Sequence, residues 1–304
     1  MGIVPLVGGV EGPPRPDYGD VLVVTRLGAS SVETFIGWTD VWMAWWLGVG
    51  RWWSGASSYT LMVVDLGGMA QWRLGVRWVA MDSCRRTTMS CVVVASMIDF
   101  MLHSSLHCKV PNGAIDITSV LIFLNALTDA PHFLMEFIQG SPTSMVVILD
   151  LLPRKDLALH PEYLHKYYEH TCLDKQREKI EELPQTRPYR SPSLFVRSAC
   201  SPTAVSVTID CGQGGEGTLE EIVCGHLASA VKEVLQIWLH SCARDTSEME
   251  EAEREIMIKR DQAVRLKSIE VDLTANLPRM FGPDVSGHII AEIRKAFGVQ
   301  LQEA

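Results

Sequence analysis

The chain has 304 residues, of which 47% are hydrophobic and 21% are charged, and its formal net charge is −9. This composition is typical of a globular protein with a substantial core, and it excludes wholesale disorder. The acidic balance argues against binding to a nucleic-acid backbone, which requires clustered cations. No run of about 18 uncharged apolar residues occurs, so we expect no membrane span. The eight cysteines form no C-x-x-C pair, and we expect most of them to be reduced.

Residues 1–95 differ in composition from the rest of the chain. They contain eight of the nine Trp and 13 of the 23 Gly, but no Lys, Asn or His. The abundant residue types have codons rich in G and T, whereas Lys and Asn have codons rich in A. We therefore interpret 1–95 as an atypical Trp/Gly/Val-rich segment, poorly ordered or not a native domain, that arises from a frame-shifted or translated non-coding stretch. A genuine Trp-rich extension is the alternative. Scattered acidic residues such as Glu11 and Asp40 make it an unconvincing transit peptide.

Residues 96–304 have the patterns of one organised domain. Apolar runs rich in β-branched residues predict five strands, at 115–124, 132–138, 145–152, 193–199 and 204–209. The short separations of the first three strands predict that they are antiparallel neighbours. Helical periodicity predicts four helices, at 161–183, 219–242, 248–269 and 284–297. Strands followed by helices indicate an α+β fold, with an antiparallel sheet and helices packed on its faces.

A glycine-rich segment follows the last predicted strand and matches the pattern G-x-G-x-x-G over residues 212–217. A dinucleotide site would place a pyrophosphate at the start of the next helix. Three carboxylates, Glu216, Glu220 and Glu221, would repel a phosphate there. A flexible loop between strand and helix is therefore the favoured interpretation, and a nucleotide-dependent reductase is the rival one.

Two histidine groups are candidate metal ligands. His103 and His107 have the i, i+4 spacing at which a helix offers two imidazoles to zinc, beside Cys108. No further ligand completes the set, so ordinary packed or surface histidines are favoured. Three other histidines recur every five residues, at 160, 165 and 170. On an α-helix this step does not keep them on one face, so we expect no metal cluster there.

Two carboxylates are candidate proton donors. Glu136 lies in the predicted strand HFLMEFI, with Leu134 and Ile138 on its own face. Burial of a carboxylate among apolar residues raises its pKa, so Glu136 could act as a general acid. The alternative is a glutamate on an edge strand that points to water. Asp272, in SIEVDLTANLPRMFG, is the second candidate, and a helix cap or a solvated loop residue is its alternative interpretation.

Longer stretches of sequence carry a family resemblance. They are SSLHCKVPNGAIDITS at 104–119, TDAPHFLMEFIQGSPTSMVVILDLLPRKDL at 128–157, HPEYLHKYYEHT at 160–171, RPYRSPSLFVRSACSPTA at 187–204, VKEVLQIWL at 231–239, KSIEVDL at 267–273 and PRMFG at 278–282. In these stretches residues 96–304 closely resemble the red chlorophyll catabolite reductases, a divergent branch of the ferredoxin-dependent bilin reductases. Residues 1–95 do not resemble the family, whose N-terminal elements we expect to be missing.

The resemblance implies an α/β/α sandwich with a central antiparallel sheet and an open-chain tetrapyrrole bound between the sheet and the C-terminal helices. It implies no bound flavin or metal: reduced ferredoxin supplies single electrons and the enzyme supplies protons. The implied reaction converts red chlorophyll catabolite to the primary fluorescent chlorophyll catabolite, in the chloroplast during senescence. Because the N-terminal part is replaced, a non-catalytic tetrapyrrole-binding protein is the alternative.

The resemblance also implies roles for particular residues. Glu136 matches the family's strand carboxylate, Asp272 matches its C-terminal carboxylate, and we expect the two to hold and protonate the pigment. Cys200 matches a position that lines the pocket and influences product stereochemistry. The acidic partner ferredoxin would need a basic patch, for which the candidates are Arg154, Lys155, Arg187, Arg190 and Arg197. A homodimer is a further expectation from the family.

Overall fold

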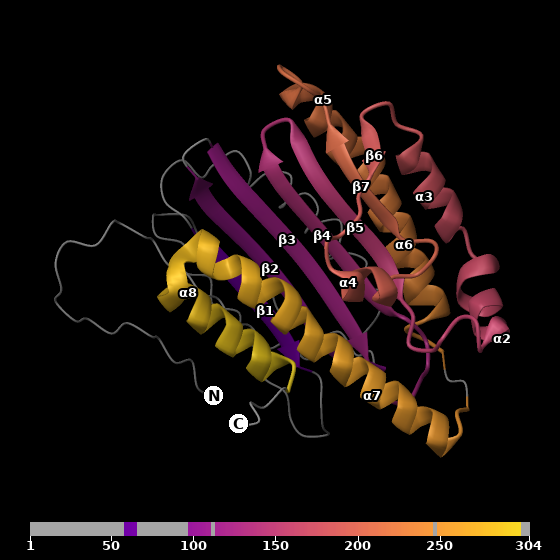
Figure 1. Cartoon of the computed structure of the whole chain (residues 1–304). Coiled ribbons are helices and arrows are strands. Elements are labelled where there is room, and N and C mark those ends of the chain that lie inside the picture. Colours follow the sequence, from indigo (N-terminus) through magenta and orange to yellow (C-terminus); the bar gives the residue numbers. More distant parts are fainter. Residues whose placement is uncertain (1–57, 66–96, 111–112, 246–247, 299–304) are drawn as a thin grey trace, which may run out of the picture.

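The computed structural model describes residues 58–65, 97–110, 113–245 and 248–298 (Figure 1). Most of residues 1–95, and with them the hypothesis on their origin, lie outside this part of the chain. The described strands form one antiparallel sheet in the order β1-β2-β3-β4-β5-β7-β6. They are β1 (Ser58–Asp65), β2 (Ile98–Val110), β3 (Gly113–Leu124), β4 (His132–Ser141), β5 (Ser144–Leu152), β6 (Thr186–Pro188) and β7 (Val205–Asp210).

Helices cover both faces of this sheet, so the predicted α/β/α sandwich is confirmed (Figure 1). They are α2 (Pro161–Leu164), the π-helix η1 (His165–Glu169), α3 (Leu173–Glu181), α4 (Leu194–Ala199), α5 (Glu216–Glu221), the π-helix η2 (Ile222–Leu227), α6 (Ala228–Ser241), α7 (Glu251–Ser268), the π-helix η3 (Ile269–Leu273) and α8 (Thr274–Ala296). The four predicted helical regions are all found. Gly282, at φ 78°, kinks α8 just before the predicted helix at 284–297.

The first face of the sheet carries the larger core. Apolar residues of β4, β5 and β7 pack there against α3 and α6, and Trp238 of α6 is fully buried. Its indole N–H donates to the carbonyl of Pro131 at 2.9 Å, so this large side chain buries no unsatisfied donor. The continuous helix Glu216–Ser241 is long and apolar enough to cross a membrane, but half of its most apolar stretch is buried in the protein. Packing on the sheet accounts for that apolar character, as in the core helix of a globular domain.

The edge strand β1 comes from the compositionally atypical N-terminal segment. It pairs with β2 from Ser58 opposite His107 to Asp65 opposite Phe100. Strand β2 itself was not predicted, because His103, Ser104 and Ser105 interrupt its apolar pattern. The strand also corrects the helical spacing that we expected for His103 and His107.

The predicted strand at 193–199 is wrong, because residues Leu194–Ala199 form the helix α4. The apolar residues in SLFVRSA favoured a strand, although they do not alternate regularly with polar ones. Ser193, however, caps the helix: its hydroxyl accepts a hydrogen bond from the backbone N–H of Val196 at 3.3 Å. The short helix lies over the second face of the sheet (Figure 1).

A π-helical turn corrects the expectation that histidines five residues apart do not share a face. In η1 the N–H of His170 donates to the carbonyl of His165, five residues earlier, at 3.0 Å. This wider turn brings residues five apart onto one face. The two imidazole rings therefore meet edge to face, with centroids 3.9 Å apart.

Candidate functional site

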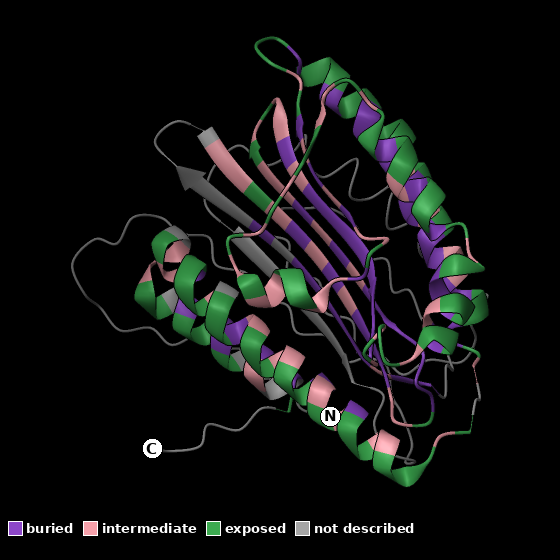
Figure 2. Ribbon diagram, turned by 45° about the vertical axis from the view of Figure 1, so that its right-hand side comes forward, coloured by how far each residue is buried: buried purple, intermediate pink, exposed green. Residues whose placement is uncertain are grey.

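The second face of the sheet is covered unevenly. Over β2 and β3, Phe100 and Phe123 pack against Ile293 of α8 and against Phe297, which directly follows this helix. Over β5, the end of α4 is held against the strand by Ser201. Between these two covers lies a set of half-buried residues on β3, β4 and β5, and Figure 2 shows residues of intermediate burial as pink bands on the strands. We call this set the Glu136 strip: Ile117, Ser119, Leu121, Leu134, Glu136, Ile138 and Val146.

Glu136 lies at the centre of this strip. Its neighbours along β4, Met135 and Phe137, point into the core on the other face, as the alternation predicted. In the sheet Glu136 pairs with Ser119 and Ile148, and the Ser119 hydroxyl donates to its Oε1 at 3.2 Å. Because β4 is an interior strand, the alternative of an edge-strand glutamate is wrong. A half-buried carboxylate surrounded by apolar side chains is suited to exchange a proton with a ligand lying on the strip.

Cys200 lies beside the same strip. It is half-buried at the end of α4, and its thiol pKa is raised to about 12 by burial and by the negative charges of Asp150 and Glu136. Because the charge of Glu136 acts on this thiol, the two residues lie near each other. The family resemblance predicted both Glu136 and Cys200 for one site. The thiol is therefore neutral near pH 7 and is not suited to act as a nucleophile. It can only border the strip as a small uncharged side chain.

Asp272 is the third predicted site residue, and its side chain lies outside the described part of the structure. Its backbone belongs to η3, which follows α7 directly. The first residue of η3, Ile269, is fully buried in the cluster that packs on β2 and β3. The helical layer that carries Asp272 thus covers the same face of the sheet as Glu136, and the pairing of the two carboxylates stays a prediction.

Asp150, which we did not predict as a candidate, lies next to Glu136. It pairs with Leu134 across β4 and β5, so it is a diagonal neighbour of Glu136 on the same face. Burial raises its pKa to about 7, although hydrogen bonds from Ser201 act in the opposite direction. The backbone N–H of Ser201 donates to Oδ2 at 2.8 Å, and the hydroxyl donates to Oδ1 at 2.5 Å. A carboxylate in the apolar run MVVILDLL was the signal that could have identified it.

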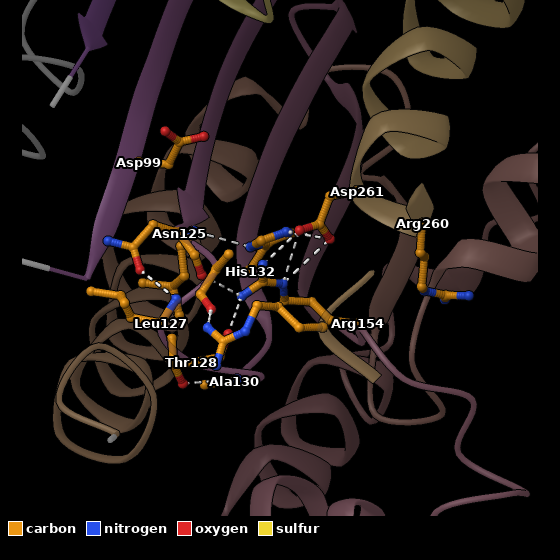
Figure 3. Close-up of polar contacts among 12 residues, drawn as sticks. Asp99, Asn125, Leu127, Thr128, Ala130, His132, Arg154, Arg260 and Asp261 are labelled. Carbon is orange, nitrogen blue, oxygen red and sulfur yellow. Dashed lines mark hydrogen bonds and ion pairs between the residues drawn. The ribbon is translucent and has the colours of Figure 1, made fainter. Parts of the chain in front are cut away.

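A buried charge cluster lies at the end of the sheet that contacts α7 (Figure 3). The N–H of Leu124 donates to Nδ1 of His132 at 3.0 Å, so the proton of the neutral ring is on Nε2, which donates to Asp261 Oδ1 at 3.0 Å. Arg154 adds bonds from Nε and Nη2 to Asp261, the shortest at 2.6 Å, and its Nη1 donates to the carbonyl of Thr128 at 2.6 Å. Asp261 thereby fixes α7 to the strand ends.

Two of the residues predicted for the ferredoxin patch, Arg154 and Lys155, are unsuited to it. Arg154 is only 2% exposed and cannot contact a partner. Lys155 is half-buried, and its ammonium group lies 2.8 Å from Asp129 and 3.0 Å from Glu253. Both cations are neutralised within the protein, whereas Arg187, Arg190 and Arg197 are exposed.

Stability should fall on acidification because of His132. Burial lowers its pKa to about 4, so the unfolded state binds more protons between about pH 6.5 and 4. Asp261 stays ionised in this range, since His132 and Arg154 outweigh the effect of burial and hold its pKa well below the usual value. We expect His132→Gln to reduce the loss of stability between pH 6.5 and 4.5 by roughly 1–2 kcal/mol. Urea unfolding at both pH values measures this, and equal losses in the two proteins would contradict it. His103, whose pKa burial also lowers to about 4, is present in both and cancels.

The other motifs have structural explanations. Gly212 and Gly214 adopt positive φ angles of 68° and 76°, as a tight turn between β7 and α5 requires. This geometry supports the loop interpretation of the glycine-rich segment. No group of three or more His, Cys, Asp or Glu residues suited to a metal ion occurs among the residues that the structure describes.

Comparisons with known proteins identify the family. The family model for red chlorophyll catabolite reductase (RCC reductase) matches residues 85–295. The barley red chlorophyll catabolite reductase is 83% identical over 203 residues, which are 67% of this chain and 99% of the relative. The chloroplastic red chlorophyll catabolite reductases of rice and Arabidopsis thaliana are 80% and 49% identical. This chain covers only 62% and 65% of their lengths, and each match spans 67% of this chain.

The fold has a solved counterpart. The crystal structure of tomato phytochromobilin synthase in complex with biliverdin matches with a TM-score of 0.51 over 67% of this chain and 66% of that one. At 19% identity this likeness establishes the fold alone. The family-model match and the barley relative establish more, and together they show that the chain belongs to the red chlorophyll catabolite reductase family.

Proposed function

We propose that the chain reduces red chlorophyll catabolite, an open-chain tetrapyrrole, to the primary fluorescent chlorophyll catabolite in the chloroplast, with electrons from reduced ferredoxin. The observation that carries this proposal is the Glu136 strip: a half-buried carboxylate in the middle of apolar side chains on the sheet face. Family membership supplies the reaction, and the rice and Arabidopsis relatives, whose names include the word chloroplastic, supply the compartment.

The strip suits the two tasks that this reaction sets. Its half-buried apolar side chains, among them Leu134 and Ile138, would pack against the conjugated rings. The saturation of one double bond takes two electrons and two protons, and ferredoxin delivers only the electrons. Glu136 would donate one proton, and Asp272 from the helical layer above would be the second carboxylate.

The proposal is tested by anaerobic incubation of the chain with red chlorophyll catabolite and reduced ferredoxin, with NADPH alone as the second arm. We expect a fluorescent product only with ferredoxin. Turnover with NADPH alone would favour a nucleotide-dependent reductase. Pigment binding without product in either arm would identify a tetrapyrrole-binding protein and overturn the proposed activity.

The proposed ferredoxin docking surface lies on the segment that runs from β6 through α4. Three cations on this short segment are exposed: Arg187, Arg190 and Arg197. Leu194, one helical turn before Arg197, is 74% exposed and could provide an apolar anchor among these charges. The segment ends at Cys200 beside the Glu136 strip, so an electron donor bound here would be close to the pigment. The homodimer stays an expectation from the family.

Charge reversal at this surface should weaken the use of ferredoxin. We expect Arg190→Glu with Arg197→Glu to raise the KM for ferredoxin about tenfold at low salt, and to leave kcat at saturating ferredoxin near the wild-type value. The wild-type KM should itself rise with ionic strength, because salt screens the attraction between the partners. The matched control, Lys175→Glu with Lys179→Glu on α3, makes the same charge change on the other side of the sheet. Equal effects of the two double variants would contradict this docking surface.

A further inference from the structure

We propose that Asp150 is a positioning residue for the reduction. It fastens the turn at Cys200 and Ser201 over the Glu136 strip and so fixes the side from which the bound tetrapyrrole is protonated. The inference rests on the proposed function, because it concerns the geometry of that reaction. Fastening this turn is a different role from the proton donation proposed for Glu136 and Asp272.

Asp150 holds the turn at Ser201 through two hydrogen bonds. Residues 200–204 link the end of α4 to the start of β7, and Ser201 is the member of this link that bonds to the sheet. Both carboxylate oxygens of Asp150 accept from Ser201, one from the backbone N–H and one from the hydroxyl. The Ser201 hydroxyl oxygen also accepts from the N–H of Thr203 at 3.2 Å. One carboxylate thus orders the backbone on both sides of Ser201, and with it the placement of Cys200.

The burial of the Asp150 carboxyl group is unfavourable in free energy. Asp150 is 2% exposed on a strand whose neighbouring residues, Leu149 and Leu151, are core apolar side chains. Burial of a carboxyl group is unfavourable, and its raised pKa of about 7 reflects that cost. An apolar residue of similar volume would be cheaper if packing were the only requirement. What an apolar residue cannot do is accept the two hydrogen bonds that hold the Ser201 turn.

Asp150 also lies close to the proposed site. Asp150 shares its sheet face with Glu136, and both carboxylates act electrostatically on the half-buried Cys200. Protonation of a prochiral carbon creates one of two epimers, depending on the face of the pigment that the donor meets. In the proposed reaction the donor Glu136 is on the sheet, so the turn at Cys200 and Ser201 would limit how the pigment lies on it. A loosened turn would therefore mix the epimers.

The test compares Asp150→Asn and Ser201→Ala with the wild type and with a control, Asp210→Asn. The control makes the same carboxylate-to-amide change at an exposed position at the end of β7. The first measurement is the epimer ratio of the fluorescent product, separated by chromatography. The second is the alkylation rate of Cys200, resolved from the other cysteines by peptide mass spectrometry. We expect one predominant epimer from the wild type and the control. For both test variants we expect a shift toward equal amounts and Cys200 alkylation about tenfold faster.

The two measurements separate the possible outcomes. If both test variants lower the yield or thermal stability but keep the wild-type epimer ratio and Cys200 alkylation rate, Asp150 is merely structural and the inference is overturned. Faster alkylation in Asp150→Asn alone would reflect the lost charge beside the thiol, and would also count against it, because Ser201→Ala retains the carboxylate. If the wild type gives no product with reduced ferredoxin, the proposed function fails. The alkylation rates then still decide whether Asp150 fastens the turn.

Discussion

Replacement of Glu136 by Gln should reduce turnover by about 10²–10⁴-fold and leave pigment binding almost unchanged. The amide has the shape of the carboxyl group and can still accept the hydrogen bond from the Ser119 hydroxyl. It cannot donate a proton to a pigment radical at a useful rate. Binding by the apolar part of the strip does not depend on that proton. Steady-state rates with reduced ferredoxin, together with absorbance titration of the pigment, measure the two quantities separately.

The matched control for this variant is Asp116→Asn. Asp116 is an exposed carboxylate on the neighbouring strand β3. It pairs with Gln139 near the C-terminal end of β4. The same chemical change should leave turnover at the wild-type level there. Near-normal product formation by Glu136→Gln would refute the role of Glu136 as proton donor, even if the family assignment stands.

Replacement of Asp261 by Asn should lower the free energy of unfolding by about 3–5 kcal/mol. The change leaves the guanidinium group of Arg154 buried without its anionic partner, at a position where that group is 2% exposed. It also weakens the acceptor for Nε2 of His132. Because α7 continues into η3, a loosened α7 should also disturb the layer that carries Asp272. Urea unfolding measures the first effect, and the KM for the pigment measures the second.

Glu253→Gln provides the comparison for this prediction. Glu253 lies on the same helix and pairs with Lys155 at 3.0 Å, but 40% of its side chain is exposed. Exposed ion pairs contribute little, so the control should lose less than about 1 kcal/mol. Similar losses in Asp261→Asn and Glu253→Gln would show that the buried cluster is not the main attachment of α7.

The strands around the site could be predicted because their local patterns agree with the final fold. The predicted strands at 115–124, 132–138 and 145–152 became β3, β4 and β5 in the expected antiparallel arrangement. Where a single polar group decides the conformation, the pattern failed. The hydroxyl of Ser193 caps the segment Leu194–Ala199, which forms the helix α4 where the apolar residues had favoured a strand. The polar residues of β2 interrupt its apolar pattern, so this long strand was not predicted.

The site was only partly predictable for a related physical reason. Glu136 stood out as a charge in an apolar strand, but the same signal at Asp150 was overlooked. Asp261 could not have been found in this way, since it is one of many charged residues on α7 and looks solvated in the sequence. Its burial depends on His132 and Arg154, which come from distant parts of the chain. Tertiary contact alone distinguishes it from the exposed charges around it.

In the proposed reaction the pigment lies on the Glu136 strip and takes a proton there. A crystal structure of the chain with bound red chlorophyll catabolite tests this most directly. We predict that the conjugated rings lie against Leu134 and Ile138, with a polar atom of the pigment within hydrogen-bond distance of the Glu136 carboxylate. A pigment bound to another surface, with the strip unoccupied, would contradict the account.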